Sequence, residues 1–437
     1  MRISRRRLVT GAVALAGSVA AADLGRALAQ VIQSPLPNPA ASGIQHVVLV
    51  MMENRSFDHL LGWLPGADGT QAGLTYVDNN GVPHATHRLA PDFQGCAHPD
   101  PDHSYQGGRV EYNSTRCDGW LRAGANDVQA IGYYTDDDLS FLGTAAPTWT
   151  VCDRYFAAIM APTFPNRLYQ HAAQTDRLTN ATTRTTLPTI WDRLAAHGLS
   201  GRYYFNDVPF LALWGPTYLP ISRPFAAFLA DCAAGTLPHV SFVDPRFTDE
   251  DSGTSSDDHP RADIRSGETF LNQVYAAITS SPNWSSTVLV INYDEWGGFF
   301  DHVPPSQTPI PAADQVAGNA DGLRGFRVPC LAIAPWAPRS AVARGVYDHT
   351  SVLKMIEWRW GLAPLTVRDA SANNLAEVLD FSRPNLAAPA VAVPPSPIGV
   401  PCPAGALLPS GQPVPAGEEE DEWAALRLIA RDDGWPV

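Results

Sequence analysis

The chain has 437 residues, of which 45% are hydrophobic and 9% aromatic, so it can form a large buried core and has the composition of a soluble globular enzyme. Its formal net charge of -14 argues against nucleic acid as the main partner, because a phosphate backbone is held chiefly by lysine and arginine. Length alone leaves the number of domains open.

The N-terminal segment has the features of an export signal. Ser4-Arg5-Arg6-Arg7-Leu8-Val9 is a twin-arginine pattern, and an uncharged apolar stretch follows from Leu8 to Ala22. Ala27-Leu28-Ala29 then offers small residues at the positions that a signal peptidase reads. A membrane anchor is the alternative, but this stretch of about 15 residues is shorter than the ~20 that span a bilayer. We expect residues 1–29 to be a twin-arginine signal peptide.

Three continuous apolar runs predict buried strands. They cover residues 46–52, 287–293 and 328–334. A short apolar run without alternation is typical of a strand that is covered on both faces, as in a parallel sheet. Asn54 or Ser56 is expected to cap a short helix that follows the first run.

Helical patterns separate these runs, at residues 189–197, 268–280 and 351–361. Buried strands that alternate with amphipathic helices indicate an α/β fold, a three-layer α/β/α sandwich around a mostly parallel central sheet. Residues 64–150 and 303–326 are expected to be irregular excursions near the edge that carries the active site. We predict a catalytic domain over 30–385 and a Pro/Ala-rich tail over 386–437, extended over the surface or mobile, that ends in a short acidic segment.

The six cysteines form no CxxC pair, which argues against a zinc ribbon. In an exported protein an even number of cysteines allows disulfides, and Cys96 with Cys117 is the first pair to test. Isolated buried thiols are the alternative, because sequence does not establish the geometry of a disulfide.

Acidic side chains follow two of the predicted strands. Glu53-Asn54 ends the first, and Asp294-Glu295 ends the second. Functional groups in an open α/β sheet gather beyond the carboxyl ends of the strands, so these four side chains are expected to converge. Three carboxylates and an amide form a hard, oxygen-rich ligand set for a metal ion. Each pair by itself could instead be a helix cap or a solvated turn.

Histidines and one threonine are candidates for the chemistry. Four Asp-His dipeptides place imidazoles in loops, at His103, His259, His302 and His349, where they could bind phosphate, ligate metal or supply a proton. A loop histidine is otherwise merely hydrogen-bonded. Thr163 lies between two nearby prolines in Ala161-Pro162-Thr163-Phe164-Pro165-Asn166-Arg167, and a hydroxyl fixed beside a metal can attack phosphorus. A rigid proline turn with a surface threonine is the alternative.

Several blocks, in order, resemble the bacterial phosphoesterase family that includes haemolytic and non-haemolytic phospholipases C and an acid phosphatase. Together they span about residues 44–370, and the first and fourth are long and specific: Met52-Glu53-Asn54-Arg55-Ser56-Phe57-Asp58-His59, Ala161-Pro162-Thr163-Phe164-Pro165-Asn166-Arg167, Asp258-His259-Pro260, Tyr293-Asp294-Glu295-Trp296-Gly297-Gly298-Phe299-Phe300-Asp301-His302-Val303-Pro304-Pro305, Gly325-Phe326-Arg327-Val328-Pro329 and Tyr347-Asp348-His349-Thr350-Ser351. The third block usually has a second proline, where this chain has Arg261.

The resemblance implies an alkaline-phosphatase-like fold and one catalytic divalent metal, Ca, Zn, Mn or Mg. It implies that Glu53, Asn54, Asp294, Glu295 and Thr163 are metal-site residues and that Thr163 is also the nucleophile. It further implies that His103 and His259 lie near the phosphoryl group, with His302 a weaker candidate.

The expected function is hydrolysis of a phosphoester, foremost a phospholipid phosphodiester cleaved by phospholipase C chemistry. A broad-specificity acid phosphatase is the alternative within this class, and a non-catalytic exported binding protein is the alternative outside it. The expected partners are a phospholipid or small phosphoester and the twin-arginine export machinery, with transient contact at a membrane surface and no nucleic acid. The expected location is periplasmic, cell-wall-associated or secreted.

Overall fold

A computed structural model describes residues 28–31, 35–249, 252–395, 399–403, 407, 413 and 418–437. The predicted signal peptide falls outside the described residues except at its last two positions, Leu28 and Ala29. The strands are β1 (Ala29–Gln30), β2 (His46–Met52), β3 (Thr75–Val77), β4 (Pro83–Ala85), β5 (His87–Arg88), β6 (Gly132–Tyr133), β7 (Thr150–Cys152), β8 (Tyr155–Phe156), β9 (Gly201–Phe205), β10 (Ser222–Pro224), β11 (Val240–Val243), β12 (Thr287–Tyr293), β13 (Cys330–Ile333), β14 (Ala341–Ala343) and β15 (Tyr347–Asp348).

Nine of these strands form the central sheet, in the order β1-β14-β7-β13-β12-β2-β11-β9-β10. Eight of them run in one direction, and β13 is antiparallel to both of its neighbours, β12 and β7. The sheet is therefore mostly parallel, as predicted. Three two-stranded sheets, β15-β8, β3-β4 and β5-β6, lie outside it.

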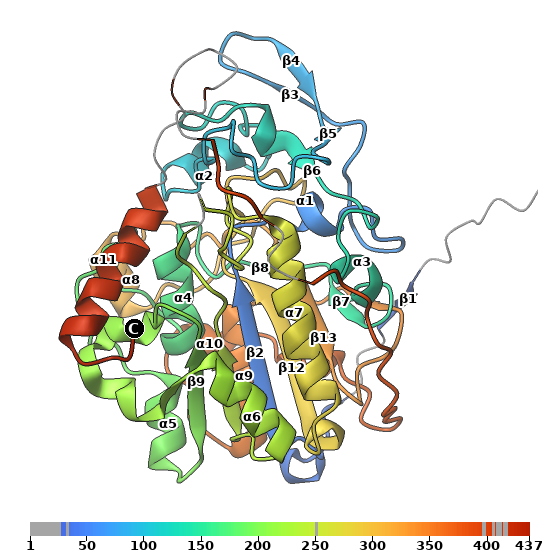
Figure 1. Ribbon diagram of the computed structural model, residues 1–437, viewed down its shortest axis with the longest axis vertical. Coiled ribbons are helices and arrows are strands. Elements are labelled where there is room, and N and C mark those ends of the chain that lie inside the picture. Colours follow the sequence, from blue (N-terminus) through green and yellow to red (C-terminus); the bar gives the residue numbers. More distant parts are fainter. Residues whose placement is uncertain are drawn as a thin grey trace, which may run out of the picture.

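Helices cover the sheet and complete an α/β sandwich (Figure 1). Helices α6 and α7 pack against each other, and α9 packs against α4 and α10. The α-helices are α1 (Phe57–Leu61), α2 (Gly107–Tyr112), α3 (Leu142–Ala145), α4 (Thr163–Ala172), α5 (Ile190–Ala196), α6 (Phe225–Ala234), α7 (Ile264–Thr279), α8 (Ala312–Ala317), α9 (His349–Trp360), α10 (Val367–Ser371) and α11 (Glu418–Asp432). The 3-10 helices are η1 (Pro39–Ala41), η2 (Val128–Ile131), η3 (Phe210–Ile221), η4 (Trp284–Ser286) and η5 (Leu375–Val378).

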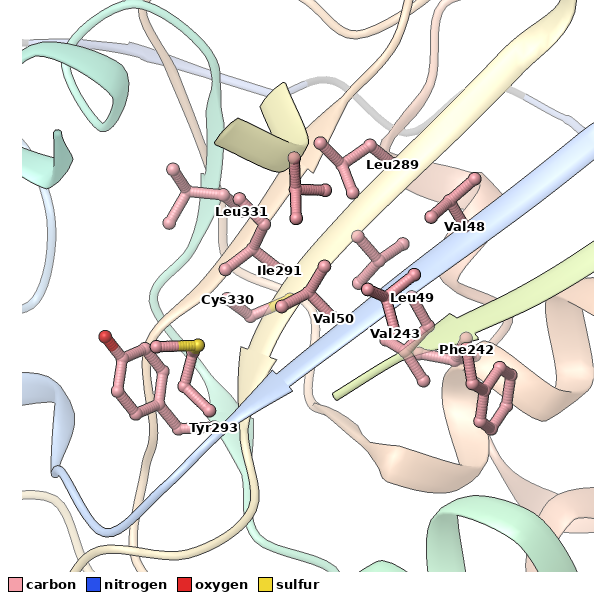
Figure 2. Close-up of a cluster of buried hydrophobic side chains, with 14 of the residues drawn as sticks. Val48, Leu49, Val50, Phe242, Val243, Leu289, Ile291, Tyr293, Cys330 and Leu331 are labelled. Atoms are coloured by element: carbon pink, nitrogen blue, oxygen red, sulfur yellow. The ribbon is translucent and has the colours of Figure 1, made fainter. Parts of the chain in front are cut away.

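The centre of the sheet is the core of the molecule. Side chains of β2, β11, β12 and β13 pack together there, among them Val48, Val50, Ile291 and Leu331 (Figure 2), and all four are at most 1% exposed. β2 pairs with β12 in parallel, in a register that sets Met52 beside Tyr293. The residues that follow these two strands therefore leave the sheet at the same edge.

The predicted elements agree with the structure except at some ends. The predicted strands at 46–52 and 287–293 are β2 and β12, and Ser56 caps α1 by accepting a hydrogen bond from the His59 N–H. The predicted strand at 328–334 begins only at Cys330, because Pro329 has no N–H with which to pair. The predicted helix at 268–280 begins earlier, at Ile264, where Asp263 is the N-cap. The stretch 64–150 is less irregular than predicted, since it contains β3 to β6, α2 and α3.

The proposed pairing of Cys96 with Cys117 is wrong. Cys96 forms a disulfide with Cys402, 306 positions later, whereas Cys117 is a buried thiol within an apolar cluster beside Trp120. Proximity in sequence misled the prediction, because the tail folds back onto the loop that contains Cys96.

The described parts of the C-terminal segment are attached to the rest of the protein. Besides the disulfide, α11 packs through its apolar face, with Trp423, Leu426 and Ala430 all 0% exposed. These residues are spaced three and four positions apart, which places them on one side of a helix. In the described part of the chain, no helix has the length and apolar character that crossing a bilayer requires.

Candidate active site

The ends of β2 and β12 bring four of the predicted site residues together. Glu53, Asn54, Asp294 and Glu295 are all 0% exposed. The Asn54 N–H donates to Asp294 Oδ1 at 3.1 Å, and the Asp294 N–H donates to the Met52 carbonyl at 3.0 Å. Asn54 has φ of 57°, a left-handed conformation that asparagine tolerates better than most residues. This turn brings the two strand ends into direct contact.

Two glycines allow the loop after β12 to approach its neighbours closely. Gly297 has φ of +62°, and a Cβ there would lie 2.1 Å from the Asn54 carbonyl oxygen. Gly298 has φ of +68°, and a Cβ there would lie 2.6 Å from Pro101 Cβ. Both positions therefore require glycine, for the left-handed backbone and for the absence of a side chain. The glycine pair holds the loop against both the Asn54 turn and the loop that carries His103.

Thr163 lies at the first position of α4, within reach of this group. Its hydroxyl donates to Asn54 Oδ1 at 3.2 Å, and the side chain is 0% exposed. Asn166 fixes the preceding loop, because its amide donates to the Ala161 carbonyl at 2.7 Å and accepts from the Ile159 N–H at 3.1 Å. Asn180 Oδ1 accepts from the Phe164 N–H at 2.8 Å. The hydroxyl is thus held at the positive end of a helix, where negative charge is favoured.

Arg167 links the carboxylates of the two strand ends. Its guanidinium lies 2.9 Å from Glu53 Oε1, 3.6 Å from Asp294 Oδ2 and 3.1 Å from Asp244 Oδ1, and its side chain is 2% exposed. Burial by itself would lower the pKa of Arg167, but the surrounding carboxylates hold that pKa above its ordinary value. Burial raises the pKa of Asp244, although the Arg167 charge and the Tyr203 hydroxyl oppose this. One buried cation therefore faces three buried acids.

His103 and His259 approach the same group from two other loops. Their ring centroids are 6.1 Å apart, and His103 Nε2 is 3.9 Å from Glu295 Oε1. His103 Nδ1 lies 2.8 Å from the Pro101 carbonyl and His259 Nδ1 lies 3.1 Å from the Pro260 carbonyl. A carbonyl only accepts, so Nδ1 carries a proton in both rings. With Asp100, these histidines can place three ligand atoms within 4.8 Å of one another, a spacing suited to a metal ion.

The residue before His259 is held firmly beneath the site. Asp258 Oδ2 accepts a hydrogen bond from the Tyr293 hydroxyl at 2.6 Å, and the backbone carbonyl of Asp258 accepts one from Arg55 Nε at 2.6 Å. Burial raises the pKa of Asp258 to about 7, against the Tyr293 hydrogen bond and the Arg55 charge. A Cβ at Gly267 of α7 would lie 1.8 Å from Asp258 Oδ1, so the helix packs directly on this carboxyl group.

His302 lies in a different group of charges. Its Nδ1 is 2.5 Å from Asp58 Oδ2, its Nε2 is 3.3 Å from Asp68 Oδ1, and Arg327 pairs with both Asp58 and Asp301. Asp58, Asp301 and His302 also meet the 4.8 Å spacing for three ligands, but the Arg327 guanidinium already supplies positive charge there. After the two glycines the chain returns toward the start of α1, where the Ser56 hydroxyl donates to the Phe300 carbonyl and His302 meets Asp58.

A cleft of about 620 Å³ borders this site. His103 and Pro162, the residue before Thr163, are part of its wall, as are Asn180 and Arg261. Glu422 of α11 also lines it, so the C-terminal segment contributes to the cleft. Thr163 and Asn54 are 0% exposed, whereas His103 is 9% exposed and lines the cleft.

Asp244 and Glu422 are among the residues of this site that the sequence did not identify, and for Arg167 the sequence leaves open a contact with phosphate or a carboxylate and a place on the helix surface. Arg167 lies four positions after Thr163, and that spacing places both on one face of α4, which would have favoured a carboxylate contact over solvent. Asp244 directly follows the short buried strand β11, the same pattern as the two strand ends that were recognised. Glu422 gave no such signal, because only the docking of α11 brings it to the cleft.

Residues 44–363 match the Phosphoesterase family. The chain is 30% identical to phospholipase C A of Mycobacterium tuberculosis, over 91% of both chains, and 32% identical to phospholipase C B of the same organism, over 82% of this chain and 83% of that one. It is 31% identical to non-specific phospholipase C6 of Arabidopsis thaliana, over 77% of this chain and 72% of that one. Among solved structures, a protein in the alkaline phosphatase superfamily from Vibrio parahaemolyticus has a TM-score of 0.34 and 10% identity, over 68% of this chain and 84% of that one.

Proposed function

The chain belongs to the Phosphoesterase family and is a phosphoric ester hydrolase, and we propose that it is a metal-dependent phospholipase C that uses Thr163 as its nucleophile. One observation carries this proposal: Thr163, Asn54, Asp294, Arg167 and Glu53 form a continuous chain of contacts next to Pro162, which lines the cleft. The relatives that match over most of their length are named phospholipases C, which supports phospholipid phosphodiesters as substrates.

The chemistry of the buried donors fits one divalent metal ion. Glu53, Asn54, Asp294 and Glu295 offer three carboxylates and an amide oxygen, and Thr163 adds a hydroxyl. Hard dications prefer such oxygen ligands. Arg167 supplies one positive charge, which does not balance the carboxylates of this buried group. A bound divalent ion would favour ionisation of the Thr163 hydroxyl and offset negative charge on the phosphoryl oxygens.

In the first half of the reaction, Thr163 Oγ1 bonds to phosphorus and its hydroxyl proton passes to solvent water. The bond from phosphorus to the oxygen of the diacylglycerol breaks, and this oxygen takes a proton from Nε2 of a protonated His103. His103 suits this role because its Nδ1 is tied to the Pro101 carbonyl, which fixes the ring at the cleft wall. The product is a phosphothreonine that still carries the head group.

In the second half, a water molecule bonds to phosphorus and gives a proton to His103, now neutral. The bond from phosphorus to Thr163 Oγ1 breaks, and Oγ1 takes up a proton from solvent. The head-group phosphate leaves and both side chains return to their starting state. Asn166 and Asn180 keep the nucleophile in place through both halves, since they fasten the loop before α4 and its first turn.

Comparison of Thr163→Ala with Thr163→Ser tests the nucleophile. We expect Thr163→Ala to lose about 10³-fold or more in kcat against a chromogenic phosphodiester, because removal of a covalent nucleophile typically has effects of this size. Thr163→Ser keeps a hydroxyl and is expected to retain much of the rate. Activity of the alanine variant near the wild-type level would exclude Thr163 as the nucleophile. Loss of activity in chelator and recovery with one particular cation would identify the metal.

The ratio of monoester to choline-diester turnover separates phospholipase C from a broad-specificity acid phosphatase. A ratio that favours the monoester would assign the chain to the acid phosphatases. The alternative of a non-catalytic binding protein is disfavoured, because the chain retains every candidate catalytic and metal-site residue.

We also propose that the protein is exported by the twin-arginine route and acts in the periplasm, at the cell wall or outside the cell. The leader pattern supports this, and a disulfide between Cys96 and Cys402 fits an oxidising compartment. Replacing Arg5 and Arg6 with lysine should retain the protein inside the cell. Export of this variant at the wild-type level would contradict the proposed route. Contact with a membrane surface during turnover follows from a lipid substrate and is part of the proposal.

A further inference from the structure

The C-terminal helix provides a charged residue at the active-site cleft. Glu422, on the first half of α11, lines the cleft together with His103, Pro162 and Arg261. Pro162 directly precedes Thr163, and His103 is the acid of the proposed reaction. A side chain from the far end of the sequence is therefore part of the surface that a substrate meets on its way to the nucleophile.

The neighbouring residue fixes the position of Glu422. Trp423 is 0% exposed, and its ring lies parallel to that of Phe247 at 3.9 Å. The same ring packs edge-on against Phe164 at 5.1 Å, and Phe164 directly follows Thr163. The helix, red in Figure 1, is thus anchored on the helix that presents the nucleophile. Leu426 and Ala430 extend the buried face, so Glu422 is held by a docked helix and not by a free tail.

The charges that line the cleft are mainly acidic. Asp100, Asp102 and Glu422 are carboxylates, whereas Arg261 and His103 are the basic groups of the wall. A cleft with an excess of one sign focuses the field and raises the local concentration of oppositely charged groups. A phosphomonoester brings two negative charges into this cleft. A phosphodiester in which one alcohol carries a quaternary or primary ammonium group brings one negative and one positive charge.

We propose that Glu422 is a specificity-determining residue, which favours phosphodiesters with a cationic alcohol and disfavours dianionic phosphomonoesters. This inference rests on the proposed function, because it concerns the selection of esters by the same cleft. It assigns to α11 a part in substrate choice, in addition to its packing against η3 and α4.

Glu422→Gln tests the inference because it removes the charge and keeps the shape. The kcat/KM should be measured for p-nitrophenyl phosphocholine, for p-nitrophenyl phosphate and for bis(p-nitrophenyl) phosphate, which has no cation. We expect the choline diester to lose about fivefold and the monoester to gain by a similar factor, as for one partly exposed charge interaction. The bis ester carries one negative charge and no cation, so it should gain by a smaller factor than the monoester.

Asp432→Asn is the matched control, since it removes one exposed carboxylate from the same helix about 15 Å further along its axis. It should leave the three substrates unchanged. A Glu422→Gln variant with the wild-type ratio of choline diester to monoester would overturn the inference, and so would an equal change in the control. A wild-type protein that turns over none of the three esters would instead overturn the proposed function, and the inference with it.

Discussion

Replacing Arg167 with methionine removes the guanidinium that Glu53, Asp294 and Asp244 share. Methionine is similar in length and can keep the packing against the Phe247 ring, which lies 4.5 Å from the guanidinium carbon. The substitution therefore tests the charge more than the volume. Its effect is expected to be large, because the carboxylates at 2.9, 3.1 and 3.6 Å remain buried after their cation is lost.

Breaking a buried ion pair by removing one partner typically costs about 3–5 kcal/mol. Two of the acids keep other donors: Asp244 keeps the Tyr203 hydroxyl, and Asp294 keeps the N–H groups of Asn54 and Glu295. We therefore expect a loss near the lower end of that range, about 3 kcal/mol in the free energy of unfolding. Against a typical total of about 5–15 kcal/mol, this is a substantial fraction.

Urea unfolding of Arg167→Met and of the wild type, both in the presence of a metal chelator, measures this loss. Arg202→Met is the matched control, because Arg202 pairs with Asp231 at 2.7 Å with a side chain that is 39% exposed, and such pairs contribute about 1 kcal/mol or less. Saturating divalent metal should restore more stability to Arg167→Met than to the wild type, since the variant has the larger uncompensated negative charge. An Arg167→Met protein as stable as the control would refute this account of the buried charges.

Three further predictions concern the supports of the site. Gly298→Ala should lose activity and about 1–3 kcal/mol in the free energy of unfolding, because the added Cβ would meet Pro101. Gly198→Ala is the control: Gly198 has a similar φ of +66° but open space around it, so this variant should lose less stability and stay active. Equal loss of activity in both variants would contradict the close approach of Gly298 to Pro101. Burial raises the pKa of Glu268 to about 8 in the folded protein, so the wild type loses stability as pH rises from 4.5 toward 8 and the unfolded state ionises first. Glu268→Gln cannot ionise, so its free energy of unfolding should rise relative to that of the wild type over this pH range. A difference between the two proteins that does not change with pH in urea titrations would contradict this. Cys402→Ser should lower the free energy of unfolding by about 2–4 kcal/mol relative to a Cys232→Ser control, and an unchanged midpoint in non-reducing conditions would exclude a stabilising disulfide.

The central strands and the acidic edge of the sheet could be predicted because their signals are local. The runs at 46–52 and 287–293 are apolar throughout, and both are bounded by acidic residues. Parallel neighbours end at the same edge, so the meeting of Glu53-Asn54 with Asp294-Glu295 follows once the two runs are strands. β11 was harder to recognise because only four residues form it.

Contacts that depend on the path of the chain over long distances could not be predicted. Cys96 finds Cys402 across 306 positions, and Trp423 reaches Phe164 only after the tail has returned to α4. His302 follows Asp294 closely in sequence, yet the turn at Gly297 and Gly298 sends it to the Asp58 group. Periodicity and composition contain no information on such returns, so both the disulfide and the cleft wall needed the structure.

The central claim is that Thr163 forms a covalent bond to the phosphorus of its substrate. Rapid acid quench during turnover of a phosphocholine diester, followed by mass spectrometry of the peptides, tests it most directly. We expect the phosphocholine fragment on the peptide of Thr163 in the wild type, on the serine in Thr163→Ser, and on no peptide in Thr163→Ala. A modified residue other than Thr163, or turnover by Thr163→Ala at the wild-type rate, would contradict it.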